Sequence, residues 1–482
     1  MTHLVLLLLC ASVASAQGPS PVAPPVAQGD EPTEAEATPE VPAVEPSAVD
    51  EAELSDAQVE ASGPELALPR GTYGELDPAA SRDALQGGAE TGDFVSPTRV
   101  GATDGSVGHF PGSLSIGAGA SRVRLGAIAH LSAAITWMAL AVDDRFSVAG
   151  VPVDGEAATD RGPRYHMSAR ESRLHFDFRM PSEIGLVRAY LETDFRSSGN
   201  APTLRHAYAQ IGNLMVGHTW SLFMDVGARP ELIDIEGPDG AIRLLHPSVR
   251  YHIPMTDNVE LALAAESAES QITVVEPVDP AGVSSQPAEL YPDMVGRLRV
   301  HGGHGHVQLA GVLRRLGMER IDDPSIHRKE WAWGGSLSGV LKLPSVSRYT
   351  SLRGQAALGR GLARYVVGTS SAAVLGEPLD AVYDEDSNLM ASLDLLGWYV
   401  ALQHGWTSSV RSTGTVGGAF LNTLDEQPGS TLRRTHYFSL NLIWSPIESI
   451  DLGVEQLFGL RENEAGAFGS STQTQLAAKV RF

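Results

Sequence analysis

Residues 173–180 read RLHFDFRM, and residues 186–195 read LVRAYLETDF. In both stretches apolar residues alternate with charged or polar ones, so each face of an extended chain carries one kind. The first stretch places on one parity Leu174, Phe176, Phe178 and Met180, and on the other Arg173, His175, Asp177 and Arg179. A period of two is typical of a β-strand with two unlike faces. The same pattern recurs through residues 167–252, the region around which we expect the chain to be organised.

The first residues of the chain are typical of an export signal. An apolar run over residues 4–9, too short to cross a membrane, precedes a small-x-small pattern at residues 14–16. Cleavage before Gln17 would remove residues 1–16 as a signal peptide. It would also remove Cys10, the one cysteine of the sequence, so the mature chain is expected to use neither disulfide bonds nor thiol catalysis.

Residues 17–110 differ sharply in composition from the rest of the chain. Proline, alanine and acids dominate without any hydrophobic period, and 18 acids stand against three bases. Most of the formal charge of −23 therefore belongs to this segment. Such a composition cannot bury enough apolar surface to fold, and its like charges extend the chain. We predict a disordered, acidic periplasmic segment here.

From residue 121 onward, strands alternate with connections. Sixteen strands are predicted, at residues 121–142, 167–180, 185–196, 202–211, 213–219, 246–254, 257–267, 291–301, 305–316, 328–343, 348–363, 387–395, 397–407, 433–445, 448–460 and 472–482. Seven of the connections are tight turns, at residues 181–183, 212–213, 254–257, 302–304, 344–347, 396–397 and 445–447. The other eight are mostly longer and polar, at residues 143–166, 197–201, 220–245, 268–290, 317–327, 364–386, 408–432 and 461–471.

Short turns interleaved with long loops are typical of an outer-membrane barrel, with the turns and both termini on the periplasmic side. No later stretch approaches the roughly 20 continuous apolar residues that a membrane-crossing helix needs. The chain ends at Phe482 on an alternating strand, which resembles the C-terminal signature of bacterial barrels. We therefore predict an all-β fold over residues 111–482: a transmembrane antiparallel β-barrel of sixteen strands in the bacterial outer membrane. Eighteen strands are the alternative if residues 121–142 or 408–432 contain another hairpin.

The third long connection is the candidate constriction, because in sixteen-stranded porins the third outer loop folds into the lumen. Its charged residues are Asp225, Glu231, Asp234, Glu236, Asp239 and, at its end, Arg243. The neighbouring strands offer Arg173, Arg179, Arg188 and Arg250, and with ambiguous parity Arg205. We expect the acids to face these arginines across a narrow aqueous gap, whose transverse field orders polar solutes and discourages apolar ones. A surface loop with solvated charges is the alternative.

The same region resembles the DcaP-type trimeric porins. The resemblance is carried by three short motifs and two longer ones, at residues 172–174, 191–195, 204–208, 217–225 and 234–240. It covers residues 168–252 well and the rest only as a strand pattern. The resemblance implies a sixteen-stranded homotrimer whose arginine-rich constriction passes small anions such as dicarboxylates. This sequence departs from the family at its N-terminus, where the family's helical coiled coil is replaced by a proline-rich segment without heptads.

These observations predict a passive pore in the lipid bilayer for small hydrophilic solutes, with a preference for anions such as carboxylates. No enzyme, catalytic residue, cofactor or metal site is expected. His301, His304 and His306 lie at a predicted turn without an acid or thiol to complete a ligand set. Net acidity disfavours nucleic acid as a partner.

Two other classes of function remain open from the sequence. One is an outer-membrane barrel enzyme, a hydrolase that would lose its activity on a single substitution and show no open lumen. The other is a structural barrel tethered by its acidic tail. Stepwise conductance in a planar bilayer would favour the pore, and deletion of residues 20–105 would abolish attachment only in the tethered barrel.

Overall fold

The structure is a computed structural model that describes most of the chain from residue 112 onward. The described residues are 112–116, 121–156, 162–275, 285–289, 291–321, 323–347, 349–384, 386–424 and 427–482. The predicted signal peptide (residues 1–16) and acidic segment (residues 17–110) lie outside them.

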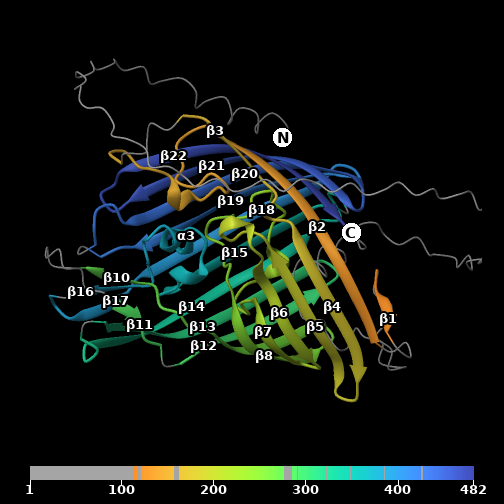
Figure 1. Cartoon of the computed structure of the whole chain (residues 1–482), viewed down its shortest axis with the longest axis horizontal. Helices are drawn as coiled ribbons and strands as arrows, with labels where there is room; N and C mark the ends of the chain where they lie inside the picture. Colours follow the sequence, from red (N-terminus) through yellow and green to blue (C-terminus); the bar gives the residue numbers. More distant parts are fainter. Residues whose placement is uncertain are drawn as a thin grey trace, which may run out of the picture. The chain divides into compact units, whose positions relative to one another are not determined.

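Sixteen antiparallel strands of the described chain form one closed barrel (Figure 1). Each strand pairs with the next along the chain, and β2 closes the ring by pairing with β22. In ring order the strands are β2 (Ser121–Thr136), β4 (Arg173–Ser182), β5 (Gly185–Asp194), β6 (Thr203–Ile211), β7 (Leu214–Trp220), β8 (Leu245–Thr256), β9 (Val259–Glu266), β12 (Asp293–Gly302), β13 (Gly305–Arg320), β14 (His327–Lys342), β15 (Ser351–Arg360), β18 (Asp394–Gly405), β19 (Val410–Asn422), β20 (Leu432–Ile447), β21 (Ile450–Asn463) and β22 (Phe468–Arg481).

The remaining elements lie at the two rims or inside the barrel. The strands that extend the barrel sheet at its rims are β1 (Leu114–Ile116), β3 (Arg164–Ser168) and β11 (Ser285–Pro287). A separate three-stranded sheet consists of β10 (Ile272–Val275), β16 (Ala381–Asp384) and β17 (Leu389–Ser392). The short helices are η2 (Val148–Gly150), η3 (Ser198–Asn200), η4 (Val226–Ala228), η5 (Ala363–Tyr365) and α3 (Thr369–Val374). Among the described residues there is no helix with the length and apolar character needed to cross a membrane.

The predicted number of barrel strands is correct, but near the C-terminus one predicted strand is not a barrel strand and one barrel strand was not predicted. The predicted turn at residues 396–397 lies inside β18, which runs unbroken from Asp394 to Gly405. The predicted loop over residues 408–432 contains β19, and the true turn between β18 and β19 is at residues 406–409. The predicted strand at residues 387–395 falls mainly on β17, which belongs to the separate three-stranded sheet, whereas the barrel strand β19 was not predicted. These two errors offset one another, so the total stayed at sixteen.

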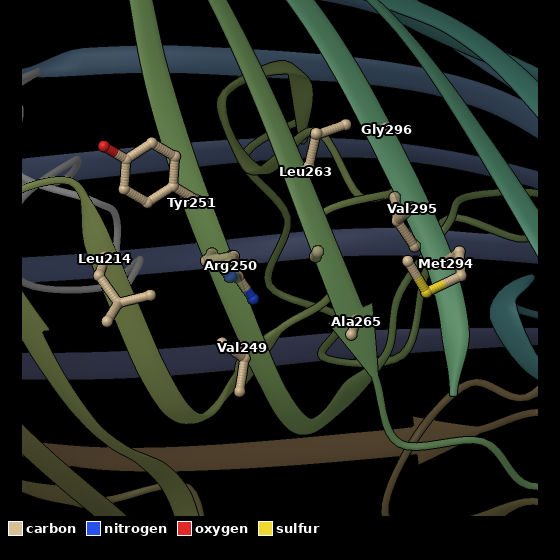
Figure 2. A pocket seen from close by; sticks show the side chains of 10 residues that line it. Leu214, Val249, Arg250, Tyr251, Leu263, Ala265, Met294, Val295 and Gly296 are labelled. Atoms are coloured by element: carbon tan, nitrogen blue, oxygen red, sulfur yellow. The ribbon is translucent and has the colours of Figure 1, made fainter. Parts of the chain in front are cut away.

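The outward face of the barrel is apolar, as the alternation predicted. Large apolar side chains are exposed along the strands, and tryptophans lie toward both rims, with Trp331 and Trp333 near one end and Trp444 near the other. Aromatic girdles of this kind mark the two membrane interfaces. On β7, β8, β9 and β12 the outward side chains line an open apolar groove (Figure 2), whose members include Leu214, Val249, Tyr251, Leu263 and Met294.

The inside of the barrel has two different halves. On β22, β2 and β4–β8, which we call the polar wall, the inward side chains are mostly charged or polar. On β9, β12–β15, β18 and β19, which we call the covered wall, the inward positions include small or apolar residues: Ala262, Ala264, Val295, Ala310, Val312, Ala357 and Ala419. Two connections pack on the covered wall with their own apolar side chains, namely Leu222, Phe223, Met224, Ile242, Leu362, Tyr365 and Val366.

These two connections are the third and sixth outer loops of the barrel. The third, residues 221–244, is called the inward loop below, and the sixth, residues 361–393, is called the sixth loop. The prediction that the third loop folds into the barrel is therefore confirmed. The sixth loop was predicted only as a polar connection, and its packing inside the barrel is a finding of the structure.

Candidate pore constriction

The polar wall holds its arginines with carboxylates from the same strands. Arg179 and Arg188 both donate to Asp177, with N–O distances of 2.7 and 2.9 Å. Arg122, Arg179 and Arg188 stand in register on β2, β4 and β5. Like charges in adjacent register repel one another, so Asp177 is needed to stabilise this row of three arginines.

Arg205 reaches the polar wall through a β-bulge. The register between β5 and β6 places Glu192 opposite His206 and then shifts by one residue, which leaves Arg205 without a partner residue. A bulge redirects side chains, and here Arg205 and His206 are both buried rather than on opposite faces. The Arg205 guanidinium donates to Glu192 at 2.9 Å and to Asp194 at 3.2 Å. Arg173 lies 3.8 Å from the same Glu192.

The inward loop is anchored at its first residues by Glu266 of β9. The carboxylate accepts hydrogen bonds from the Ser221 hydroxyl and the Leu222 amide, both at 2.7 Å. It also accepts from His246 Nε2 at 2.8 Å. Three donors from three different residues hold this buried carboxylate in place, so the loop leaves the barrel wall from a fixed point.

Asp225 fixes the loop to the covered wall. Its carboxylate accepts from Arg299, from His306 Nε2 at 2.8 Å and from the Ser338 hydroxyl at 2.8 Å. Burial alone would raise the pKa of Asp225, but the His306 hydrogen bond and the Arg299 charge lower it below its ordinary value. Asp225 is therefore ionised at neutral pH and binds three different strands, β12, β13 and β14.

The middle of the loop continues along β15 and β19–β21. Arg353 donates to the carbonyl oxygens of Gly227 and Arg229, both at 3.0 Å. Glu231 forms a bidentate pair with Arg411, with both N–O distances at 2.6 Å. Two donors on one planar guanidinium fix orientation as well as distance, so this part of the loop is held tightly to the wall.

The loop then passes a buried acidic seat, which we define as Asp234, Glu236 and Asp239. Asp234 accepts from the Tyr437 hydroxyl at 3.2 Å, and Glu236 lies 3.6 Å from Arg145. Burial, together with the charge of Glu236, raises the pKa of Asp234 to about 6. Burial and the charges of Glu236 and Asp234 raise the pKa of Asp239 to about 7. Protons are therefore bound in this seat near neutral pH.

The predicted opposition of acids and arginines across a gap is not what the structure contains. The acids of the inward loop contact the covered wall and its neighbours, where Asp225 binds Arg299 and Glu231 binds Arg411. The arginines of the polar wall bind carboxylates of the polar wall itself. Asp225, Glu231, Arg188 and Arg205 are thus each paired with a partner on their own side of the lumen.

The returning limb of the inward loop runs beside the sixth loop as a backbone ladder. Gly240 N donates to Val367 O at 3.0 Å, Val367 N donates to Ala241 O at 2.8 Å, and Arg243 N donates to Tyr365 O at 2.8 Å. Gly240 has φ +83°, and a Cβ there would collide with the carbonyl oxygen of Gly418. Only glycine allows the loop backbone to approach the wall so closely.

Arg243 stands at the end of this limb and faces other positive charges. Burial and the charges of Arg229, Arg196 and Arg205 lower the pKa of Arg243 to about 9, with Glu236 acting in the opposite direction. It remains protonated at neutral pH. Among the described residues no carboxylate forms an ion pair with Arg243, which distinguishes it from Arg205.

Arg205 and Arg243 meet at Trp220, the last residue of β7. The guanidinium carbon of Arg205 lies 5.7 Å from the centroid of the indole ring, and that of Arg243 lies 6.0 Å from it. Arg250, the last of the predicted arginines, donates to the carbonyl oxygen of Trp220 at 2.5 Å. The structure thus brings three of the predicted arginines together at one tryptophan.

Several residues of this region were not predicted as site residues from the sequence. They are Arg145, Trp220, Arg299, His306, Tyr365 and Arg411. Strand parity alone could have placed Arg299 inside the barrel, whereas Arg411 lay in the predicted loop over residues 408–432. His306 was considered only as a metal ligand, and in the structure it binds Asp225. Among the described residues no group of three or more histidines, cysteines or acids could hold a metal ion.

Comparison with known proteins agrees with this architecture. The family model for the DcaP outer membrane protein matches residues 116–482. The outer membrane channel DcaP of Acinetobacter baumannii has a similar solved structure, with 21% identity, 77% of this chain and 99% of that chain covered, and a TM-score of 0.65. The anion-selective porin from Comamonas acidovorans is more distant, with 10% identity, coverage of 75% and 100%, and a TM-score of 0.48.

None of the curated proteins compared with the chain matches it. The family match, however, extends over far more than half of the sequence and includes every strand of the barrel. The chain therefore belongs to the family of DcaP outer membrane proteins, and its closed sixteen-stranded barrel is that of a porin of the bacterial outer membrane.

Proposed function

We propose that this porin conducts small hydrophilic solutes passively and favours anions, with carboxylates as the preferred class. The observation that carries the proposal is the pair of guanidinium groups at Trp220. Arg205 is turned inward by a bulge, and Arg243 is brought to the same ring by the returning limb of the inward loop. The mechanism is electrodiffusion, without a covalent step.

The charge balance near Trp220 supports an anion preference. Glu192 and Asp194 offset much of the charge of Arg173 and Arg205. Arg243 has no such carboxylate among the described residues, so a net positive charge remains beside Trp220. A surplus of one sign between low-dielectric walls concentrates ions of the opposite sign and raises their entry rate.

The orientation of the loop acids supports the same conclusion. If Asp225 and Glu231 faced Arg205 and Arg243, their negative charges would cancel the net positive charge beside Trp220. Both are instead bound to Arg299 and Arg411 on the other side of the loop. A carboxylate solute can then bind guanidinium groups through charge-assisted hydrogen bonds without competition from these two side chains.

The test is the reversal potential of refolded protein in a planar bilayer under a potassium chloride gradient. The native protein should give stepwise conductance and a potential of the sign expected for anion preference. Arg243→Ala should move the potential toward zero. Arg205→Ala should move it further, because Glu192 and Asp194 then lose their main cation.

Arg315→Ala provides the matched control. Arg315 lies over the ring of Trp331 at 4.9 Å, and Trp331 is exposed on the outer surface. Removing this arginine changes the net charge by the same amount but not the charge of the lumen. The proposal would be overturned if the native protein showed no anion preference, or if Arg315→Ala reduced that preference as much as Arg243→Ala does.

Three further predictions from the sequence belong with this proposal. We propose that the assembly is a homotrimer, in line with the family resemblance, and chemical cross-linking in detergent would test it. That the chain has no enzymatic activity stays a prediction, as does the removal of residues 1–16. A hydrolase would be recognised by turnover that a single substitution abolishes.

A further inference from the structure

Trp220 is buried among the charged groups of the proposed constriction. The residue is 4% exposed. Besides the two guanidinium groups, the ring of His206 meets it edge-on, with centroids 5.7 Å apart and an angle of 69° between the rings. Little of the indole surface is left for a passing solute, so any influence of Trp220 on conduction must act through its neighbours.

The backbone on both sides of Trp220 is fixed. Its carbonyl oxygen accepts from Arg250, and the residue pairs with Leu245 in the register of β7 and β8. The next residue, Ser221, donates to the buried Glu266. The indole is therefore attached to a rigid backbone at the point where the inward loop leaves the wall. Its position does not depend on the two arginines that contact it.

Arg243 depends on this indole more than Arg205 does. Two carboxylates hold the Arg205 guanidinium, whereas no ion pair holds that of Arg243 among the described residues. Burial lowers the pKa of Arg243, and the like charges of Arg229, Arg196 and Arg205 lower it further because they repel this guanidinium. A tryptophan face attracts a guanidinium within about 6 Å through its quadrupole, more strongly than tyrosine or phenylalanine does.

We infer that Trp220 is a positioning residue for the selectivity of the pore: it holds the guanidinium of Arg243 beside that of Arg205, so that one anion can meet both. This inference rests on the proposed function. The backbone of Arg243 is set by the sixth loop through Tyr365 O, and the indole sets the direction of its side chain. Without the ring, Arg243 turns away from Arg205 because their like charges repel.

The experiment replaces Trp220 in the full-length protein and measures the reversal potential and the conductance of refolded channels. Trp220→Leu removes the π face but keeps an apolar side chain. It should shift the potential toward zero by about as much as Arg243→Ala, while stepwise conductance remains. Trp220→Phe keeps a weaker ring face and should give an intermediate potential, which also tests the inference if the leucine variant does not fold.

Phe223→Leu is the matched control for loose packing. Phe223 is a fully buried aromatic residue of the same loop, and its ring contacts Tyr365 edge-on at 5.6 Å rather than a guanidinium. Its truncation should weaken thermal stability but leave the reversal potential at the native value. An equal shift in the Phe223 variant would show that the effect of Trp220 is merely structural and would overturn the inference.

A double variant separates this inference from the proposed function. If Trp220 acts through Arg243, then Trp220→Leu combined with Arg243→Ala should shift the potential no further than Arg243→Ala alone. Additive shifts would refute the link. If the native protein shows no anion preference, the proposed function itself is wrong. If the native protein favours anions, and Arg243→Ala reduces that preference while Trp220→Leu does not, only the role of Trp220 is wrong.

Discussion

The inner faces of the two halves of the barrel carry opposite kinds of side chain. The polar wall presents charged groups such as Arg188 and Glu192, paired within the wall, whereas the covered wall presents Ala262, Ala357 and other small side chains. Two loops fill the space in front of the second half and bring their own apolar residues. On both halves the outer face exposes large apolar side chains, such as Leu125 of β2 and Leu337 of β14.

This difference shows that the number of strands does not by itself set the cross-section of the pore. A sixteen-stranded barrel encloses a wide space, and here one side of that space is occupied by packed loop. The covered wall behaves as a protein core with lipid on its other face. We propose that the polar wall is the half that lines the conduction path.

The largest effect is expected from a charge placed in the covered wall. Ala357→Asp puts a carboxylate at a position that is fully buried among loop side chains, at a cost of about 3 kcal/mol or more. The same substitution at Ala477, an inward, half-buried position of β22, should be tolerated. Thermal unfolding of both variants in detergent measures the contrast, and equal destabilisation would mean that the two walls do not differ.

A smaller loss of stability is expected when the ion pairs that bind the inward loop to the covered wall are removed. Asp225→Ala removes the carboxylate that binds Arg299, His306 and Ser338 and leaves the cation without its partner. The expected loss is about 2–4 kcal/mol, with larger and noisier single-channel conductance. Ser338→Ala removes one neutral donor and should cost about 1 kcal/mol. A conductance for Asp225→Ala equal to the native value would contradict the role of this anchor.

The smallest effect concerns the pH dependence of the acidic seat. Burial raises the pKa of Asp234 to about 6 and that of Asp239 to about 7. Because these carboxyls bind a proton more tightly in the folded protein, protonation adds to the free energy of unfolding. This contribution is complete below the ordinary carboxyl pKa of about 4 and is lost as the pH rises through 6 and 7. The melting temperature should therefore be higher at pH 5 than at pH 8.

Asp239→Asn cannot ionise and should flatten this dependence, with a gain on the order of 2 kcal/mol at pH 8. Asp154→Asn, at an exposed position in the first outer loop, is the control and should leave the pH profile unchanged. A melting temperature that rises between pH 5 and pH 8 in the native protein would disprove the assignment. Thermal scans across that range measure it.

The outward faces of most strands could be predicted from the sequence because lipid on one side and polar side chains on the other impose alternation, whereas the number of strands agrees only because two errors offset one another. The errors fall where the inner face is covered. In β19 the inward positions include Gly417 and Ala419 rather than polar residues, so the alternation disappears. Gly397 was interpreted as a turn, but a Cβ there would lie 2.7 Å from Gly240 O. Glycine is therefore required at position 397 because the inward loop passes close to the strand, not because the chain turns there.

The site was predictable only in part. The sequence was sufficient to single out the third loop and the arginines of β4, β5 and β8. It could not give the bulge at Arg205, because one extra residue changes which side chains face inward without any local signature. It also could not tell that Asp225 and Glu231 face the covered wall, since their partners Arg299 and Arg411 are more than 70 residues away in sequence.

The ladder between the inward loop and the sixth loop has a consequence for how this porin can vary. Outer loops are the part of a surface protein that meets phages, antibodies and toxins, and they usually tolerate change. Here Tyr365 and Val367 of an outer loop bond to the limb that carries Arg243. Escape variants are therefore expected to accumulate in the other outer loops. Residues 365–367 are buried inside the barrel, so a change there would not help to evade a binder but would disturb the limb that carries Arg243 and, with it, the proposed anion preference.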